Sequence, residues 1–114
     1  MKNYRVDYTR IDANGKTGAN HFNVAANDRK DAAGKAKDRI KSMAEGALAR
    51  GIERTYTVTS LKHEPRYFRL TYIDKDGRER KEVGAATSVQ MCKRACTSMG
   101  WKYICAEEVA GDEV

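Results

Sequence analysis

Lysines recur at helical spacing in the first half of this 114-residue chain. At about 100° per residue, Lys30, Lys37 and Lys41 fall in one row along a helix. A row of ammonium groups can bind the phosphates of a nucleic acid and release their condensed counterions. The alternative is a solvated helix face, because acidic residues run beside the lysines and one of them, Asp31, is placed to pair with Lys35.

Further basic residues are expected on strand faces and at a hairpin tip. Arg5 and Arg69 each alternate with apolar residues, so they would lie on the face of a sheet opposite the core. A flat face with arginine, threonine and tyrosine can bind phosphate and stack bases, and it can equally meet a protein or water. Arg78, Arg80 and Lys81 at a tip are placed to touch phosphate, although charged tips also discourage edge pairing.

Residue types typical of metal or catalytic sites are present but lack the spacing that such sites need. The chain has three cysteines and two histidines. Cys92 and Cys96 lie in an apolar helical stripe, whereas structural zinc sites usually have two close-spaced ligand pairs. We expect reduced, buried thiols. Neither histidine has an evident nucleophile partner, and no phosphate-binding glycine loop occurs. The sequence therefore predicts a non-catalytic protein without metal or cofactor.

The net charge of +6 is concentrated in the first half of the chain. Residues 1–62 hold 13 Lys+Arg against 7 Asp+Glu, whereas residues 63–114 hold 9 of each. Such asymmetry favours an anionic partner or serves solubility. No apolar run approaches the roughly 20 residues of a membrane span, and the polar, alternating start is not typical of a signal peptide. We expect a cytoplasmic protein with no membrane association.

The elements that would position these residues occur twice. The turn sequence IDANGK at residues 11–16 is nearly repeated as IDKDGR at residues 73–78. Before each turn, apolar and polar residues alternate as in a strand with one buried face. Asn14-Gly15 and Asp76-Gly77 then supply residues that suit hairpin turns. A second strand is expected to follow each turn.

Each return strand leads to an amphipathic helix and then to a third strand. Gly51 and Gly100 mark the helix ends, where glycine commonly adopts a positive φ. The expected capping residues at the helix starts are Asn27 or Asp28 and Thr87 or Ser88.

We interpret the chain as a tandem duplication of a ββαβ unit, at about residues 3–62 and 66–106, followed by a short acidic tail at 107–114. A right-handed connection through the helix would place the third strand beside the first. We expect one compact α+β domain, with a mostly antiparallel six-stranded sheet and both helices on one face. Exchange of strands between the two chains of a homodimer is the alternative.

Two functions are compatible with these features. The favoured one is a small basic binding protein that contacts nucleic acid or a nucleic-acid-handling complex. The alternative is a protein-binding inhibitor or adaptor that occupies a partner's surface through an edge strand or a flat face. Small, highly charged chains of this kind are common among phage accessory proteins.

Overall fold

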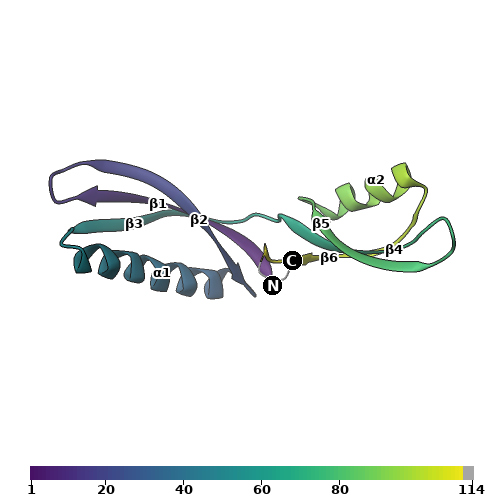
Figure 1. The fold of residues 1–114 in the computed structure, drawn as a ribbon, viewed down its shortest axis with the longest axis horizontal. Coiled ribbons are helices and arrows are strands. Elements are labelled where there is room, and N and C mark those ends of the chain that lie inside the picture. The colour runs from purple at the N-terminus through teal and green to yellow at the C-terminus, as the bar shows by residue number, and fades with distance from the viewer. Residues whose placement is uncertain (112–114) are drawn as a thin grey trace. The chain divides into compact units, whose positions relative to one another are not determined.

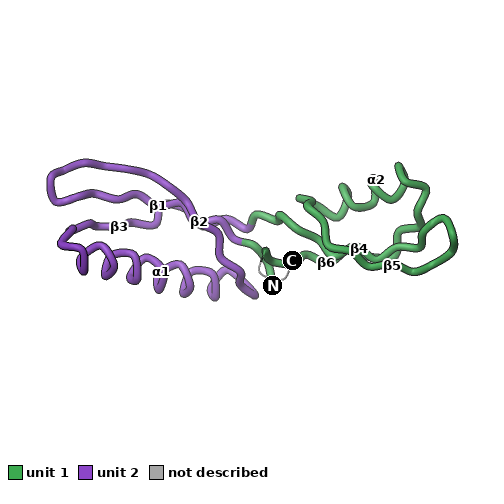
Figure 2. Tube along the Cα trace, viewed as in Figure 1, with its two compact units in different colours: residues 1–3, 64–114 green, residues 4–63 purple. Residues whose placement is uncertain are grey.

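The computed structural model of the chain describes residues 1–111. These residues form two helices and six strands, and the strands make two antiparallel three-stranded sheets (Figure 1). The chain divides into two compact units, which we call the N-terminal unit (residues 4–63) and the C-terminal unit (residues 1–3 with those from 64 onward) (Figure 2). The fold is therefore α+β, and each unit consists of one sheet and one helix.

Strand β1 lies in the middle of the sheet of the N-terminal unit. The elements in chain order are β1 (Lys2–Asp12), β2 (Thr17–Ala26), α1 (Arg29–Ala49) and β3 (Arg54–His63). The strand order is β2-β1-β3, so the third strand lies beside the first, as the sequence predicts. Strands β1 and β3 pair from Tyr4 opposite His63 to Asp12 opposite Arg54. A β-bulge shifts this register and leaves Thr59 as the extra residue of β3.

The core of the N-terminal unit lies between its sheet and α1. Alternate side chains of β1 and β2 point to the same face, and the small side chains of α1 let the helix approach that face closely. Ile40, Met43 and Leu61 pack around the edge of this core. The buried members of this cluster are Tyr4, Val6, Phe22, Val24, Ala26, Ala32 and Ala36, and Ala47 near the end of α1 is also buried.

Side-chain oxygens cap both helices at their starts. In α1, the Asp28 carboxylate accepts the N–H of Asp31 at 2.8 Å, and the Asp31 carboxylate accepts the N–H of Asn27 at 3.0 Å. The first bond satisfies an N–H of the first helical turn, and the second ties the residue before the cap to the helix. In the second helix, the Ser88 hydroxyl accepts the N–H of Met91 at 3.2 Å. Of the expected alternatives, Asp28 and Ser88 are therefore the caps.

The C-terminal unit contains the remaining elements, with β4 in the middle of its sheet. These are β4 (Tyr67–Ile73), β5 (Glu79–Ala85), α2 (Val89–Met99) and β6 (Lys102–Val109), in the strand order β5-β4-β6. Strand β6 includes Glu107 and Glu108, which the sequence analysis assigned to an acidic tail; residues 112–114 of that tail lie outside the described residues. The buried core is Phe68, Leu70, Tyr72, Ala86, Cys92 and Cys96.

The two units share their element order and turn geometry but differ in helix length. In the first hairpin, the Asp12 N–H donates to the Lys16 carbonyl at 2.9 Å; in the second, the Asp74 N–H donates to the Arg78 carbonyl at 2.9 Å. Both helices are followed by a glycine with φ near +75°, as the sequence predicts. Helix α1 has 21 residues, whereas α2 has 11.

The expected single six-stranded sheet is replaced by two three-stranded sheets. Strands β1 and β4 each pair on both edges with strands of their own unit, so only outer strands are left to join the sheets. No pairing of outer strands across the two sheets occurs in residues 1–111. Neither described helix is both long and apolar enough to cross a membrane.

Candidate functional site

The lysine row of α1, formed by Lys30, Lys37 and Lys41, lies on the exposed side of the helix. All three side chains are exposed, and within residues 1–111 none forms an ion pair with a carboxylate. The opposite side of the helix carries Ala32 and Ala36, which are buried against the sheet. At 1.5 Å per residue, the row spans about 16 Å along the helix axis. The lysine row therefore presents three free ammonium groups in one line.

Other basic residues of α1 bond to the sheet. The Arg29 guanidinium donates to the Leu61 carbonyl at 2.8 Å. The Lys35 ammonium donates to the Ala25 carbonyl at 2.6 Å and lies 3.7 Å from the Asp31 carboxylate. These bonds hold α1 in one rotation about its axis, with the lysine row on its exposed side.

The arginines expected on the open sheet faces are paired with carboxylates. Arg5 Nε lies 3.1 Å from Asp7 Oδ1 on the same strand. Arg69 Nη1 lies 3.8 Å from Glu107 Oε2 on the neighbouring strand. These partly exposed pairs add little stability, but each cancels the charge that a phosphate would need. Arg5 and Arg69 are therefore compensated cations, unlike the lysines of the row.

The tip of the second hairpin combines free and paired cations. Arg80 Nε donates to Asp74 Oδ2 at 2.6 Å. The backbone N–H groups of Asp76 and Arg78 donate to Asp74 Oδ1 at 2.9 and 3.0 Å. The Arg80 bond, with these N–H groups, lowers the pKa of Asp74 below its ordinary value. Arg78 and Lys81 remain exposed without an ion pair in the described part of the chain.

A polar pocket in the N-terminal unit contains an arginine that the sequence analysis missed. The pocket has a volume of about 260 Å³. Arg10 stands at the position of β1 that continues the inward alternation of Tyr4, Val6 and Tyr8. An arginine at a core-facing position is the sequence signal that would have found it. The lining residues are Tyr8, Arg10, Gly18, Ala19, Asn20, Met43, Arg54 and Tyr56.

The two arginines of this polar pocket differ in their partners. Arg54 Nε donates to Asp12 Oδ1 at 3.0 Å, and its pKa is raised first by a bond to Tyr56 and then by the charge of Asp12. Arg10 has no carboxylate partner within residues 1–111. Its side chain lies across Gly18, where a Cβ atom would come within 2.9 Å of Arg10 Nε. The pocket therefore offers one uncompensated guanidinium to an anion.

An apolar groove of about 320 Å³ lies between α1 and the edge strand β3. Ile40 and Leu61 form part of its wall, and Val58 is 41% exposed within it. Lys37 stands at its rim. The groove can take apolar side chains of another chain.

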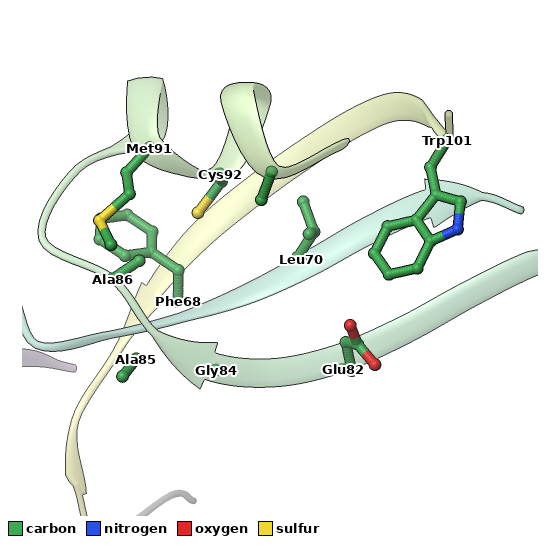
Figure 3. Close-up of a pocket in the computed structure, with 10 residues that line it drawn as sticks. Phe68, Leu70, Glu82, Gly84, Ala85, Ala86, Met91, Cys92 and Trp101 are labelled. Atoms are coloured by element: carbon green, nitrogen blue, oxygen red, sulfur yellow. The ribbon is translucent and has the colours of Figure 1, made fainter. Parts of the chain in front are cut away.

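A second apolar pocket, of about 180 Å³, lies between α2 and the sheet of the C-terminal unit (Figure 3). Phe68 and Leu70 rise from β4, and Cys92 faces them from α2. Glu82 on β5 is the charged residue of its lining. The Trp101 ring at one end stacks on Tyr72, with centroids 4.0 Å apart.

The cysteines are free thiols in the described residues. Cys92 and Cys96 are buried, and Cys105 is exposed. Burial raises the pKa of Cys92 and Cys96 above the ordinary value, which keeps both in the neutral form. Within residues 1–111 no three metal-ligating side chains gather into one group.

Comparison with known protein families, curated proteins and solved structures gives no match.

Proposed function

We propose that the chain is a non-catalytic basic protein whose N-terminal unit binds the phosphates of a nucleic acid. The observation that carries the proposal is the lysine row of α1, with three exposed ammonium groups and no ion pair among the described residues. Phosphate contacts of this kind supply most of the affinity of sequence-independent binding. A line of cations on a rigid helix suits the regular spacing of a phosphate backbone better than scattered charges do.

The distribution of charge supports the same surface. Residues 4–63 hold 12 Lys+Arg against 7 Asp+Glu, a net of +5, whereas the rest of the chain holds 10 against 9, a net of +1. The free guanidinium of Arg10 in the polar pocket adds a cation to this unit. A long polyanion would be drawn to the N-terminal unit first, because its potential is the more positive.

The proposal is tested by neutralising the lysine row. A triple variant, Lys30→Gln, Lys37→Gln and Lys41→Gln, is compared with a control triple that makes the same charge change in the C-terminal unit: Lys2→Gln, Lys75→Gln and Arg94→Gln. The affinities for labelled single-stranded and duplex DNA and RNA are measured by fluorescence anisotropy at about 50 and 200 mM salt, a range over which phosphate contacts weaken strongly.

We expect wild-type affinity to fall steeply with salt. The lysine-row variant should lose a large part of that dependence, since each lost phosphate contact reduces the slope of log K against log salt by about 0.7 to 0.9. The control triple should keep the slope. Equal losses in the two variants would mean that net charge alone attracts the nucleic acid, and wild-type affinity that does not change with salt would overturn the proposal.

We also infer that the two units arose by duplication of one ββαβ segment. The shared strand order, the matching turn hydrogen bonds and the glycine after each helix support this inference. The two copies then differ in function, because only the copy with the longer helix carries the lysine row. Three free cysteines suit a reducing compartment, so we place this function in the cytoplasm.

A protein-binding inhibitor or adaptor is the second candidate function, and the groove between α1 and β3 favours it. An extended partner segment could pair with the edge strand β3 and insert an apolar side chain beside Val58. In a pull-down from lysate, this function predicts a bound protein that survives nuclease treatment and is lost in Val58→Lys. Release of all bound material by nuclease would count against it.

A further inference from the structure

The apolar pocket of the C-terminal unit exists because a glycine stands where the other unit has a phenylalanine. Gly84 follows Gly77 at the same spacing as Phe22 follows Gly15. The Phe22 ring is 7% exposed and belongs to the core of its unit. At Gly84, no heavy atom lies within 4 Å of the place that a Cβ would take. The C-terminal unit therefore has open space at the position that Phe22 fills in the N-terminal unit.

The size and walls of this space fit one ring. Its volume is about 180 Å³, and an apolar cavity of about 150 Å³ is large enough to bind benzene. Phe68, Leu70 and Cys92 are each less than a tenth exposed and form the buried wall of the pocket. Met91 also lines it and is 49% exposed, so the pocket is open to solvent.

One end of the pocket is suited to a positive charge. The Glu82 side chain rises from β5 on the side of the sheet that carries Leu70 and Trp101 (Figure 3). No lysine or arginine forms an ion pair with Glu82 in the described residues. The Trp101 ring lines the same pocket, and the face of an aromatic ring attracts cations. Burial first, and the Glu82 carboxylate second, raise the pKa of Tyr72.

We propose that this pocket binds a small aromatic monoamine. The ring lies in the space left by Gly84, between α2 and β5, and the ammonium group bonds to the Glu82 carboxylate. This site is separate from the lysine row and does not depend on nucleic-acid binding.

The test uses the full chain with benzylamine, toluene and benzoate as probes. Trp101 is the single tryptophan of the chain, so its fluorescence reports occupancy of the pocket directly. We expect benzylamine to bind about tenfold tighter than toluene, as one charged hydrogen bond contributes about that factor, and benzoate to bind more weakly than either. Glu82→Gln should reduce benzylamine affinity to that of toluene.

Filling the pocket provides the decisive variant. Gly84→Phe introduces the residue that the other unit already carries, and it should abolish the response to benzylamine and to toluene. Gly46→Phe is the matched control, because Gly46 also has open space at its Cβ position but lies on α1 of the other unit. This control should bind both probes as wild type does.

A second measurement keeps the test valid if Gly84→Phe fails to fold. In the wild-type chain, the methyl resonance of Met91 and the indole N–H resonance of Trp101 should shift together as benzylamine is added. Equal affinities for benzylamine and toluene, binding that survives in folded Gly84→Phe, or no shift of either resonance at millimolar probe would each overturn the proposal.

Discussion

At the scale of single residues, partners decide which cations are available for binding. Arg5 and Arg69 are paired with carboxylates on their own sheets, whereas Lys37 on α1 is exposed and unpaired within the described residues. Each of these residues adds one positive charge to the net charge, but they differ in how readily they bind a phosphate. At a paired arginine the phosphate must displace a carboxylate, whereas at an unpaired lysine it displaces only solvent.

Arg10 and Arg5 allow this distinction to be tested with equal changes of charge. Arg10→Gln should weaken nucleic-acid binding at low salt by about fivefold, the equivalent of about 1 kcal/mol for one close charge contact in water. Arg5→Gln should have a smaller effect, because Asp7 already neutralises that guanidinium. Anisotropy titrations of the two variants give the comparison. A larger loss in Arg5→Gln would contradict the assignment of Arg10 to the phosphate surface.

Asp74 at the second turn gives a pH-dependent prediction. The Arg80 bond and two backbone N–H groups lower its pKa in the folded chain below the ordinary value of 3.8. Its stabilising contribution is therefore complete above pH 3.8 and is lost as the pH falls through the lowered folded-state pKa. Asp74→Asn should reduce the urea midpoint at pH 7 and approach the wild-type midpoint in strong acid. An equal deficit at both pH values would contradict this account.

At the scale of elements, the sequence correctly predicted the features that depend on interactions within a few residues along the chain. The helix starts were predicted to within one residue, with Asp28 and Ser88 each one of two cap candidates, and the glycines after the helices and the hairpin turns were predicted directly. All of these features satisfy backbone groups within a few residues. The lysine row was predicted for the same reason, because helical spacing alone defines it. The amphipathic pattern of α1 predicted a core face that included Ala32, Ala36 and Ala47, which are buried, but it also included Ala33, which is exposed.

Features that depend on packing between strands were not predicted. In β6, a bulge at Ile104 breaks the alternation, so that Tyr103 and Ala106 pack against the core whereas Cys105 is exposed. No local pattern marks such an extra residue, because its place is set by the partner strand. The division into two sheets was not predicted for a related reason. The alternation of apolar and polar residues shows which face of a strand is buried, but it does not show which strands pair with each other. Arg10 stands at a core-facing position that the strand pattern does mark, but the pocket that it lines forms only when β2, α1 and β3 pack around β1.

Helix α1 must pack against its sheet through Ala36, which is 3% exposed. Ala36→Asp should destabilise the N-terminal unit by about 3 kcal/mol, since it leaves a charge buried without a partner. Ala33→Asp is the matched control on the exposed side of the same helix and should change stability little. Urea unfolding followed by circular dichroism measures both. Equal midpoints for Ala36→Asp and wild type would show that the buried face of α1 is assigned wrongly.

At the scale of the whole molecule, two similar units carry different surfaces. The N-terminal unit has the longer helix, the lysine row and most of the net charge, whereas the C-terminal unit has the shorter helix and an apolar pocket. Each unit has its own core, so one can change its surface without repacking the other. We infer that the repeated architecture supports two different binding sites in one chain.

The most direct measurement of the central claim is an amide chemical-shift map of the isotope-labelled chain during titration with a short oligonucleotide. We expect the largest shifts on the exposed side of α1 around Lys30, Lys37 and Lys41 and at the Arg10 pocket. These shifts should reverse as salt is added, since phosphate contacts are released by competing ions. Shifts confined to residues 64–111, or shifts of α1 that persist unchanged at high salt, would contradict it.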